Sequence, residues 1–181
     1  MRRDRLPNER PAFPILHIIG LPGSGKTTLA QHLSRKLKLP IFQIGTYRSK
    51  FPLSPIGEAD AWVALFTDLS RRKWSNCILE TTGLNRRECF LGTAFPFSQM
   101  ITIKLDAQRK ILYARIGKKR KAEQGGEWLF SADYPDKYEF VKRLYREFKK
   151  LPADIRIDTT KLTPGKVYRT ALIKLEVYKT S

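Results

Sequence analysis

A short stretch near the amino terminus combines several glycines with a lysine and a threonine, namely Gly20, Gly23, Gly25, Lys26 and Thr27. Glycines tolerate backbone dihedrals that a Cβ disfavours, so the N–H groups of this stretch can turn inward. Inward N–H groups and the positive end of a following helix together form a cradle for an anion. Lys26 could then reach the β- and γ-phosphates of a nucleotide, and the Thr27 hydroxyl could ligate Mg²⁺.

The flanking sequence supplies the context that this chemistry needs. The stretch matches the P-loop pattern Gly-x-x-x-x-Gly-Lys-Thr. Residues 15–19 are predicted to form a buried strand, and residues 27–37 carry leucine and alanine at helical spacing. The alternative is a glycine-rich turn that matches by chance. We expect nucleotide binding by Gly20, Leu21, Pro22, Gly23, Ser24, Gly25, Lys26, Thr27 and Thr28.

Composition indicates one globular domain with a strong positive charge. The chain has 181 residues, of which 41% are hydrophobic, and its formal net charge is +18. This length suffices for one domain with a proper core, which we place at residues 14–181 after a basic arm at residues 1–13. The charge favours nucleotides, polynucleotides or anionic surfaces as partners, although solubility alone is an adequate reason for it.

Two cysteines and the absence of long apolar runs limit the cellular setting. Cys77 and Cys89 lie in neither a CxxC pair nor a metal-ligand pattern, which is typical of reduced thiols. The amino terminus lacks the apolar core of a secretory signal, and no run reaches membrane-spanning length. We therefore expect a cytoplasmic protein with no membrane partner.

Charged residues follow two further predicted strands. In an open parallel sheet the carboxyl ends of the strands face the ligand. Arg48, in a predicted loop after the strand at residues 41–45, could hold an anionic acceptor or could simply be exposed. Glu80 ends the strand at residues 77–80 and could polarise an acceptor hydroxyl or hold Mg²⁺ through water. Arg86 could grip a substrate phosphate, with exposure as the alternative.

The remaining pattern alternates helices and strands. Asp106 is predicted to cap a basic helix that contains Arg115 and Arg120 and runs into a Gly-Gly loop. That arrangement indicates a lid that closes over triphosphate, or else a basic surface helix with a turn. Alternation of this kind predicts a parallel α/β sheet with right-handed crossovers. The other expected elements are helices at 58–73, 133–150 and 163–175 and strands at 100–105 and 154–160.

Taken together, these motifs resemble the small P-loop kinases. That group includes nucleoside monophosphate kinases, shikimate- and gluconate-kinase-like enzymes and polynucleotide 5′-kinases. The segments Gly45-Thr46-Tyr47-Arg48 and Glu80-Thr81-Thr82-Gly83, with Arg86, are similar to the kinase half of the phosphofructo-2-kinase enzymes. Residues 157–164 resemble the fifth-strand exit of such kinases, where the loop borders the adenine, which implies that Thr160 contacts the nucleotide.

The resemblance covers about residues 14 to 178, and the P-loop is its sharpest part. It implies a three-layer P-loop NTPase fold, in which a five-stranded parallel sheet has helices on both faces and a small basic lid. It also implies ATP with Mg²⁺ as the donor. The chain departs from the family at Glu80, where an Asp is usual, and at Gly83, where an Asn is usual.

Three function classes follow. The first is an ATP-dependent phosphotransferase in which Lys26 holds the donor, Thr27 and Glu80 hold the metal, and Arg48 and Arg86 bind an anionic acceptor. Arg115 or Arg120 would neutralise the moving phosphoryl group. The second is a P-loop ATPase or nucleotide switch. The third is a nucleic-acid-binding protein in which the nucleotide site is regulatory or vestigial.

Overall fold

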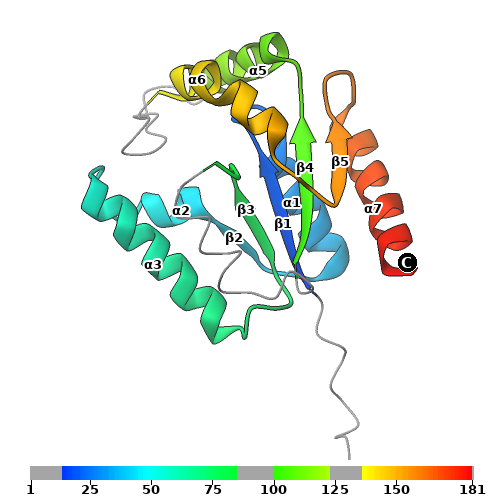
Figure 1. Ribbon diagram of the computed structural model, residues 1–181, viewed down its shortest axis with the longest axis horizontal. Helices are drawn as coiled ribbons and strands as arrows, with labels where there is room; N and C mark the ends of the chain where they lie inside the picture. Colours follow the sequence, from blue (N-terminus) through cyan, green and yellow to red (C-terminus); the bar gives the residue numbers. More distant parts are fainter. Residues whose placement is uncertain (1–13, 85–99, 123–135, 181) are drawn as a thin grey trace, which may run out of the picture.

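A parallel β-sheet forms the centre of the molecule. The computed structural model describes residues 14–84, 100–122 and 136–180 (Figure 1). Within them, five strands pair in the order β2-β3-β1-β4-β5, and every pairing is parallel. The strand that leads into the glycine-rich loop therefore lies in the middle, as expected. The strands are β1 (Ile15–Gly20), β2 (Ile41–Gln43), β3 (Ile78–Thr81), β4 (Met100–Asp106) and β5 (Ile155–Asp158).

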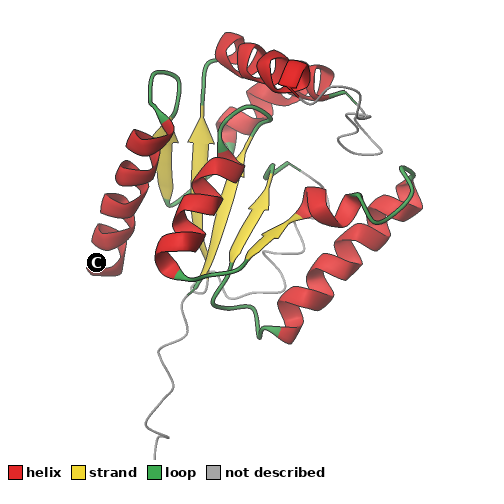
Figure 2. Ribbon diagram, turned by 180° about the vertical axis from the view of Figure 1, so that it is seen from behind, coloured by secondary structure: helices red, strands yellow, loops and turns green. Residues whose placement is uncertain are grey.

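Helices cover both faces of this sheet, so the three-layer prediction is confirmed. In Figure 2, α1 lies in front of the strands, and α7 packs with it on the same face. On the other face, α3 covers the strands on the β2 side, and α6 packs near the carboxyl ends together with α5. The helices are α1 (Lys26–Leu37), α2 (Ile44–Arg48), α3 (Pro55–Arg71), α5 (Arg109–Ala122), α6 (Lys137–Lys150) and α7 (Pro164–Thr180).

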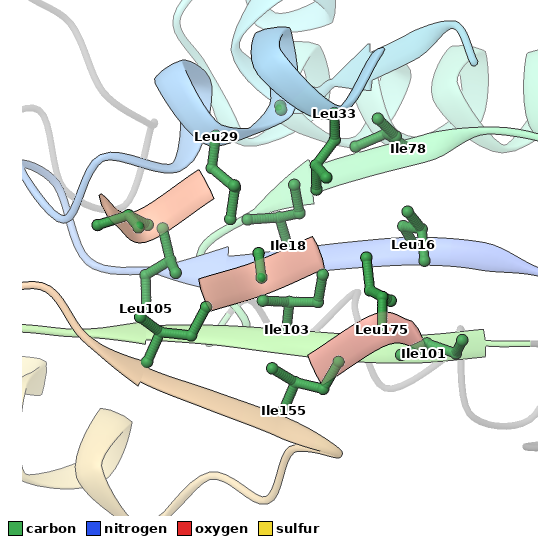
Figure 3. Packing of buried hydrophobic residues seen from close by; sticks show 14 of the residues in the cluster. Leu16, Ile18, Leu29, Leu33, Ile78, Ile101, Ile103, Leu105, Ile155 and Leu175 are labelled. Carbon is green, nitrogen blue, oxygen red and sulfur yellow. The ribbon is translucent and has the colours of Figure 1, made fainter. Parts of the chain in front are cut away.

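Alternating side chains of β1 separate the hydrophobic clusters of the two faces. Leu16 and Ile18 point into the cluster beneath α1 and α7, whereas Ile15 and Ile19 join the clusters of the opposite face. Figure 3 shows Leu29 and Leu33 of α1 packed against the aliphatic side chains of the strands. A strand buried on both faces needs mostly apolar residues, and residues 15–19 are apolar apart from His17.

One buried cation belongs to the sheet itself. Lys104 of β4 is fully buried, and its Nζ donates hydrogen bonds to the carbonyl oxygens of Lys149 and Leu151, each 3.0 Å away. The same Nζ lies 4.8 Å from the ring centroid of Phe148. Burial lowers the pKa of Lys104, and nearby Asp106 opposes that shift. Lys104 thus fastens the carboxyl end of α6 to the central strands.

The structure corrects two local predictions. Thr46–Arg48, expected as a loop, belongs to helix α2, because Ile44 and Tyr47 lie one turn apart and both are buried under α3. Asp106 does not cap a helix. It ends β4, and its carbonyl accepts a hydrogen bond of 2.7 Å from the backbone N–H of Thr159. The first helix after β4 begins only at Arg109.

Several predictions lie outside the described residues. These are the basic arm at residues 1–13, Arg86, Cys89 and the Gly-Gly loop of the expected lid. Cys77 is described, and it is a buried free thiol just before β3. No helix of the described part of the chain is long and apolar enough to cross a membrane.

Candidate functional site

The glycines of the loop between β1 and α1 serve two different physical purposes. Gly23 and Gly25 have φ values of 81° and 97°, a region that side chains strain. Gly20 does not have a positive φ, so the prediction that all three glycines supply unusual dihedrals is wrong for it. A Cβ at Gly20 would lie 2.3 Å from the Ser24 Oγ, so this position needs space. Gly25 also caps α1, with its carbonyl accepting from the Leu29 N–H at 3.0 Å.

The predicted donor-binding and metal-binding side chains lie together at this loop. Lys26 reaches back across it, and its Nζ donates to the Leu21 carbonyl at 3.3 Å. The Thr27 hydroxyl donates to Glu80 Oε1 at 2.8 Å. This contact forms because alternation along β3 turns Glu80 toward α1. Residues far apart in the sequence therefore meet at the carboxyl edge of the central strands.

An open cavity of about 200 Å³ lies above this contact. It is bounded by the loop, by α2, by the end of β3 and by the two basic helices α5 and α6. Its charged lining residues are the cations Lys26, Arg48, Arg115 and Lys137 and the carboxylate of Glu80. This excess of positive charge suits anionic groups. Of the predicted site residues, Pro22, Gly23 and Thr27 also line it.

Arg48 reaches the cavity as one member of a buried network. Its Nε donates to Glu58 Oε2 at 2.8 Å, and its Nη2 donates to Glu58 Oε1 at 2.7 Å. The same Oε1 accepts from the indole N–H of Trp62 at 2.9 Å. The side chains of Arg48 and Glu58 are only 13% and 2% exposed. Sequence reasoning named Arg48 and missed Glu58, which looked like one more polar residue of an amphipathic helix.

Arg115 of α5 connects the loop to the exit of β5. Its Nη1 donates to the Thr159 hydroxyl at 3.1 Å and approaches the Gly23 carbonyl at 3.4 Å. Its Nη2 donates to the Thr159 carbonyl at 2.7 Å. The Thr159 hydroxyl also lies 3.1 Å from the Ser24 carbonyl. In the described structure Arg115 therefore braces the loop from outside.

A second cavity, also of about 200 Å³, lies on the other side of this brace. Thr28 and Thr159 line it, together with the apolar side chains of Leu162 and Val167. Thr160, the residue predicted to contact the nucleotide, does not line this cavity. Its hydroxyl accepts from the Gln108 N–H at 3.0 Å. Thr159 is thus the residue of the β5 exit that touches the loop, and nothing in the sequence separates these adjacent threonines.

A histidine supports the segment that follows β3. His17 of β1 is buried, and its Nε2 lies 2.8 Å from the Thr81 Oγ1. Burial lowers the pKa of His17 to about 4, so the ring is neutral at pH 7. The Thr81 Oγ1 also accepts from the Gly83 N–H at 3.2 Å. Since Thr81 and Thr82 line the cavity, His17 helps to fix its wall from below.

The donor set at Thr27 and Glu80 fits a magnesium ion. Glu80 is 4% exposed, and its Oε2 has no hydrogen-bond partner among the described residues. A buried, unsatisfied carboxylate oxygen beside a hydroxyl is the kind of oxygen pair that Mg²⁺ prefers. The described residues contain no group of three His, Cys, Asp or Glu that could hold a metal ion. Mg²⁺ usually retains waters and takes phosphate oxygens as ligands, so few protein oxygens are enough to hold it.

Two predicted residues have no described side chain. Arg86 lies outside the described residues, and Arg120 lies in α5 with nothing described of its side chain.

Lys137, at the start of α6, lies on the cavity wall, which was not predicted from the sequence. The sequence signal for this position is Asp136, a residue type that commonly caps a helix, directly before an amphipathic segment. The structure confirms the cap, since the Asp136 carboxylate accepts from the backbone N–H of Glu139 at 3.2 Å.

Comparison with solved structures finds proteins of similar fold. A shikimate kinase from Acinetobacter baumannii in complex with shikimate is 16% identical, with a TM-score of 0.64 and coverage of 93% of this chain and 96% of that chain. The chain has the fold of the small P-loop kinases. A gluconokinase from Sinorhizobium meliloti is similar at 15% identity, with a TM-score of 0.62 and coverage of 96% and 99%.

A third structure with this fold is an APS kinase from Mycobacterium tuberculosis in complex with AMPPNP and APS. It is 15% identical, with a TM-score of 0.58, and the match covers 92% of this chain and 99% of that one. Comparison of the sequence with family models finds no match, and comparison with curated proteins finds none either. The likeness is therefore one of fold, and the chemistry must be argued from the site.

Proposed function

We propose that this protein is an ATP-dependent phosphotransferase that moves the γ-phosphate of ATP to a small anionic acceptor. The observation that carries the proposal is the contact between the Thr27 hydroxyl and the buried Glu80 carboxylate at the base of a cation-lined cavity. A metal-binding hydroxyl, a carboxylate and a lysine in this arrangement are the parts that phosphoryl transfer requires.

The donor would occupy the glycine-rich loop. The backbone N–H groups of residues 20–27 and the amino end of α1 would bind its phosphates. Lys26 would leave the Leu21 carbonyl and neutralise the outer phosphates. Thr27 and, through water, Glu80 would hold Mg²⁺, which when bound neutralises charge on the β- and γ-phosphates. Thr28, Thr159 and the apolar cavity behind Arg115 would take the nucleoside.

The acceptor would occupy the cavity on the other side of the loop. Glu80 stands where it could accept a proton from a hydroxyl group as that group attacks phosphorus. Arg48 and Lys137 would bind a negative group on the same molecule. Structures with this fold are named as kinases of shikimate, gluconate and APS, which supports an acceptor of small size. Arg115 would add charge around the phosphoryl group, as would Arg86 and Arg120, whose side chains the structure does not describe.

The test is a transfer experiment. The protein is incubated with γ-labelled ATP and Mg²⁺ over a panel of nucleotides, oligonucleotide 5′-ends and small hydroxy acids. We expect label on an acceptor that carries both a hydroxyl and an anionic group. Label released only as inorganic phosphate would replace the proposal with an ATPase or nucleotide switch. If calorimetry shows no binding of ATP with Mg²⁺, the protein is not a kinase.

The same panel separates small acceptors from polynucleotides. The basic residues of α5 and α6 give a polynucleotide a surface to bind. Binding of a single-stranded oligonucleotide that falls steeply between low and physiological salt would favour that class. Absence of such binding at low salt would favour a small acceptor, for which the cavity of about 200 Å³ has room.

A further inference from the structure

We propose that Glu58 is a positioning residue that presents Arg48 to a phosphate or similar tetrahedral anion on the acceptor. The inference rests on the proposed function, because it assigns the acceptor side of the same cavity. It starts from the ion pair between Arg48 and Glu58, whose burial costs desolvation free energy. Glu58 is 3% exposed, and its two carboxylate oxygens are both occupied by Arg48.

Stability alone is a poor reason for such a pair. Taking two charges out of water costs free energy that their attraction often only offsets, and apolar residues of similar volume commonly do as well. Clusters of apolar side chains already surround this place, among them Tyr47, Ala61 and Leu65. A charged pair retained here, with one member on the cavity wall, therefore points to a role for the cation in binding.

The geometry fixes the cation in one orientation. Glu58 holds the edge of the guanidinium formed by Nε and Nη2, and the planar group then directs Nη1 away from Glu58. Trp62 donates to the same carboxylate, which prevents Glu58 from rotating. A guanidinium held in this way loses little entropy when it binds an anion, so its affinity rises. The edge that includes Nη1 suits bidentate contact with phosphate oxygens.

The local backbone is also built to place Glu58. Ser54 caps α3, and its hydroxyl accepts from the Gly57 N–H at 3.0 Å. A Cβ at Gly57 would lie 2.0 Å from the Pro52 carbonyl oxygen, so only glycine allows this tight approach. Glu58 then falls in the first turn, where the helix dipole stabilises a carboxylate.

A second link between α2 and α3 supplies a matched control. The Tyr47 hydroxyl donates to Asp68 Oδ2 at 2.8 Å. Asp68→Asn therefore weakens a contact between the same two helices. Neither Tyr47 nor Asp68 lines the cavity. If Glu58 had a merely structural role, folded Glu58→Gln would bind phosphate as well as folded Asp68→Asn does.

The experiment is a titration of inorganic phosphate followed by the NMR signal of the Arg48 Nε–H, assigned with Arg48→Lys. Saturating AMPPNP with Mg²⁺ fills the glycine-rich loop, and sodium chloride at matched ionic strength serves as the blank. We expect the wild-type signal to shift saturably with phosphate. Glu58→Gln should weaken phosphate binding by about tenfold or more, while Asp68→Asn should change it by less than about twofold.

Trp62→Phe keeps the ion pair but removes the indole donor, and it should weaken phosphate binding severalfold. This variant keeps the test open if Glu58→Gln does not fold. No shift in the wild type, or equal binding by wild type, Glu58→Gln and Trp62→Phe, would overturn the inference. Binding of AMPPNP, measured separately by calorimetry, reports on the proposed kinase function. Because the signal belongs to Arg48, the two failures are distinguishable.

Discussion

The two sides of the glycine-rich loop are built in different ways. On the proposed donor side, adjacent residues would make the site, since the loop at residues 20–27 combines backbone N–H groups, a lysine and a threonine in one run. On the proposed acceptor side, Arg48 is held by Glu58, which in turn contacts Trp62, and both of these residues come from another helix. A phosphate site made of backbone N–H groups can stay the same whichever acceptor is used. A site made of side chains can be altered by substitution to suit a different acceptor. The difference explains why the donor side was easier to foresee.

The largest effect should come from the donor side. Lys26→Ala removes the cation that neutralises the outer phosphates, so we expect kcat/KM for transfer to fall by about 10⁴-fold. The check is steady-state kinetics with labelled ATP. Lys36→Ala, an exposed lysine of the same helix, is the matched control and should leave the rate unchanged. Wild-type turnover by Lys26→Ala would remove the basis of the donor assignment.

Glu80 connects the two sides, and its loss should cost about 10³-fold in kcat. Glu80→Gln keeps the hydrogen-bonding shape for Thr27 but loses the charge. Glu80→Asp, with the residue that is usual in the family, should retain more activity because it keeps a carboxylate. Rates measured over a range of Mg²⁺ concentrations separate the two roles. A higher Mg²⁺ requirement indicates metal binding, whereas a lower kcat at saturating Mg²⁺ indicates a proton acceptor.

The stability of the protein should decrease in acid because of His17, which contacts Thr81 on the cavity wall. His17 has a folded-state pKa of about 4 against an ordinary value of 6.5, so the unfolded state binds more protons between these values. Stability is therefore full above about pH 6.5 and decreases as the pH falls toward 4, by up to about 3 kcal/mol. Urea titrations from pH 7 to pH 4 measure this slope. His17→Gln should flatten it, and an unchanged slope would contradict the assignment.

The smallest effect distinguishes two adjacent threonines. Thr159→Val removes the hydroxyl that contacts Arg115 and the loop, and should weaken binding of ATP with Mg²⁺ by about 1 kcal/mol. Thr160→Val removes only the contact with the Gln108 N–H and should have less effect on nucleotide affinity. Calorimetry of AMPPNP binding compares the two. The reverse order would favour Thr160 as the residue that borders the nucleotide.

Local patterns were enough to predict the sheet and its central strand. Apolar residues at 15–19 and helical spacing after the loop require no knowledge of distant contacts. The approach of Glu80 to Thr27 was also foreseeable, because parallel strands end at one edge. The helical state of Thr46–Arg48 was not, since it depends on burial of Ile44 and Tyr47 beneath α3.

Contacts between side chains that are far apart in the sequence could not be predicted either. Glu58 looks like an ordinary polar position of an amphipathic helix, and only folding brings its carboxylate to Arg48. The space requirement at Gly20 also depends on a neighbour, the Ser24 hydroxyl, which the loop turns back toward it. Side-chain networks of this type carry no periodic signal, so sequence patterns cannot reveal them.

The lysine buried in β4 fixes one end of α6 to the sheet and leaves the other end without this anchor. Lys104 holds the helix at Lys149 and Leu151, while Lys137 stands at the opposite end on the cavity wall. A small tilt about the anchored end would carry Lys137 toward or away from a bound molecule and leave the sheet undisturbed. Hydrogen exchange should accordingly be slowest at the anchored end of α6, and Lys104→Met should remove that gradient.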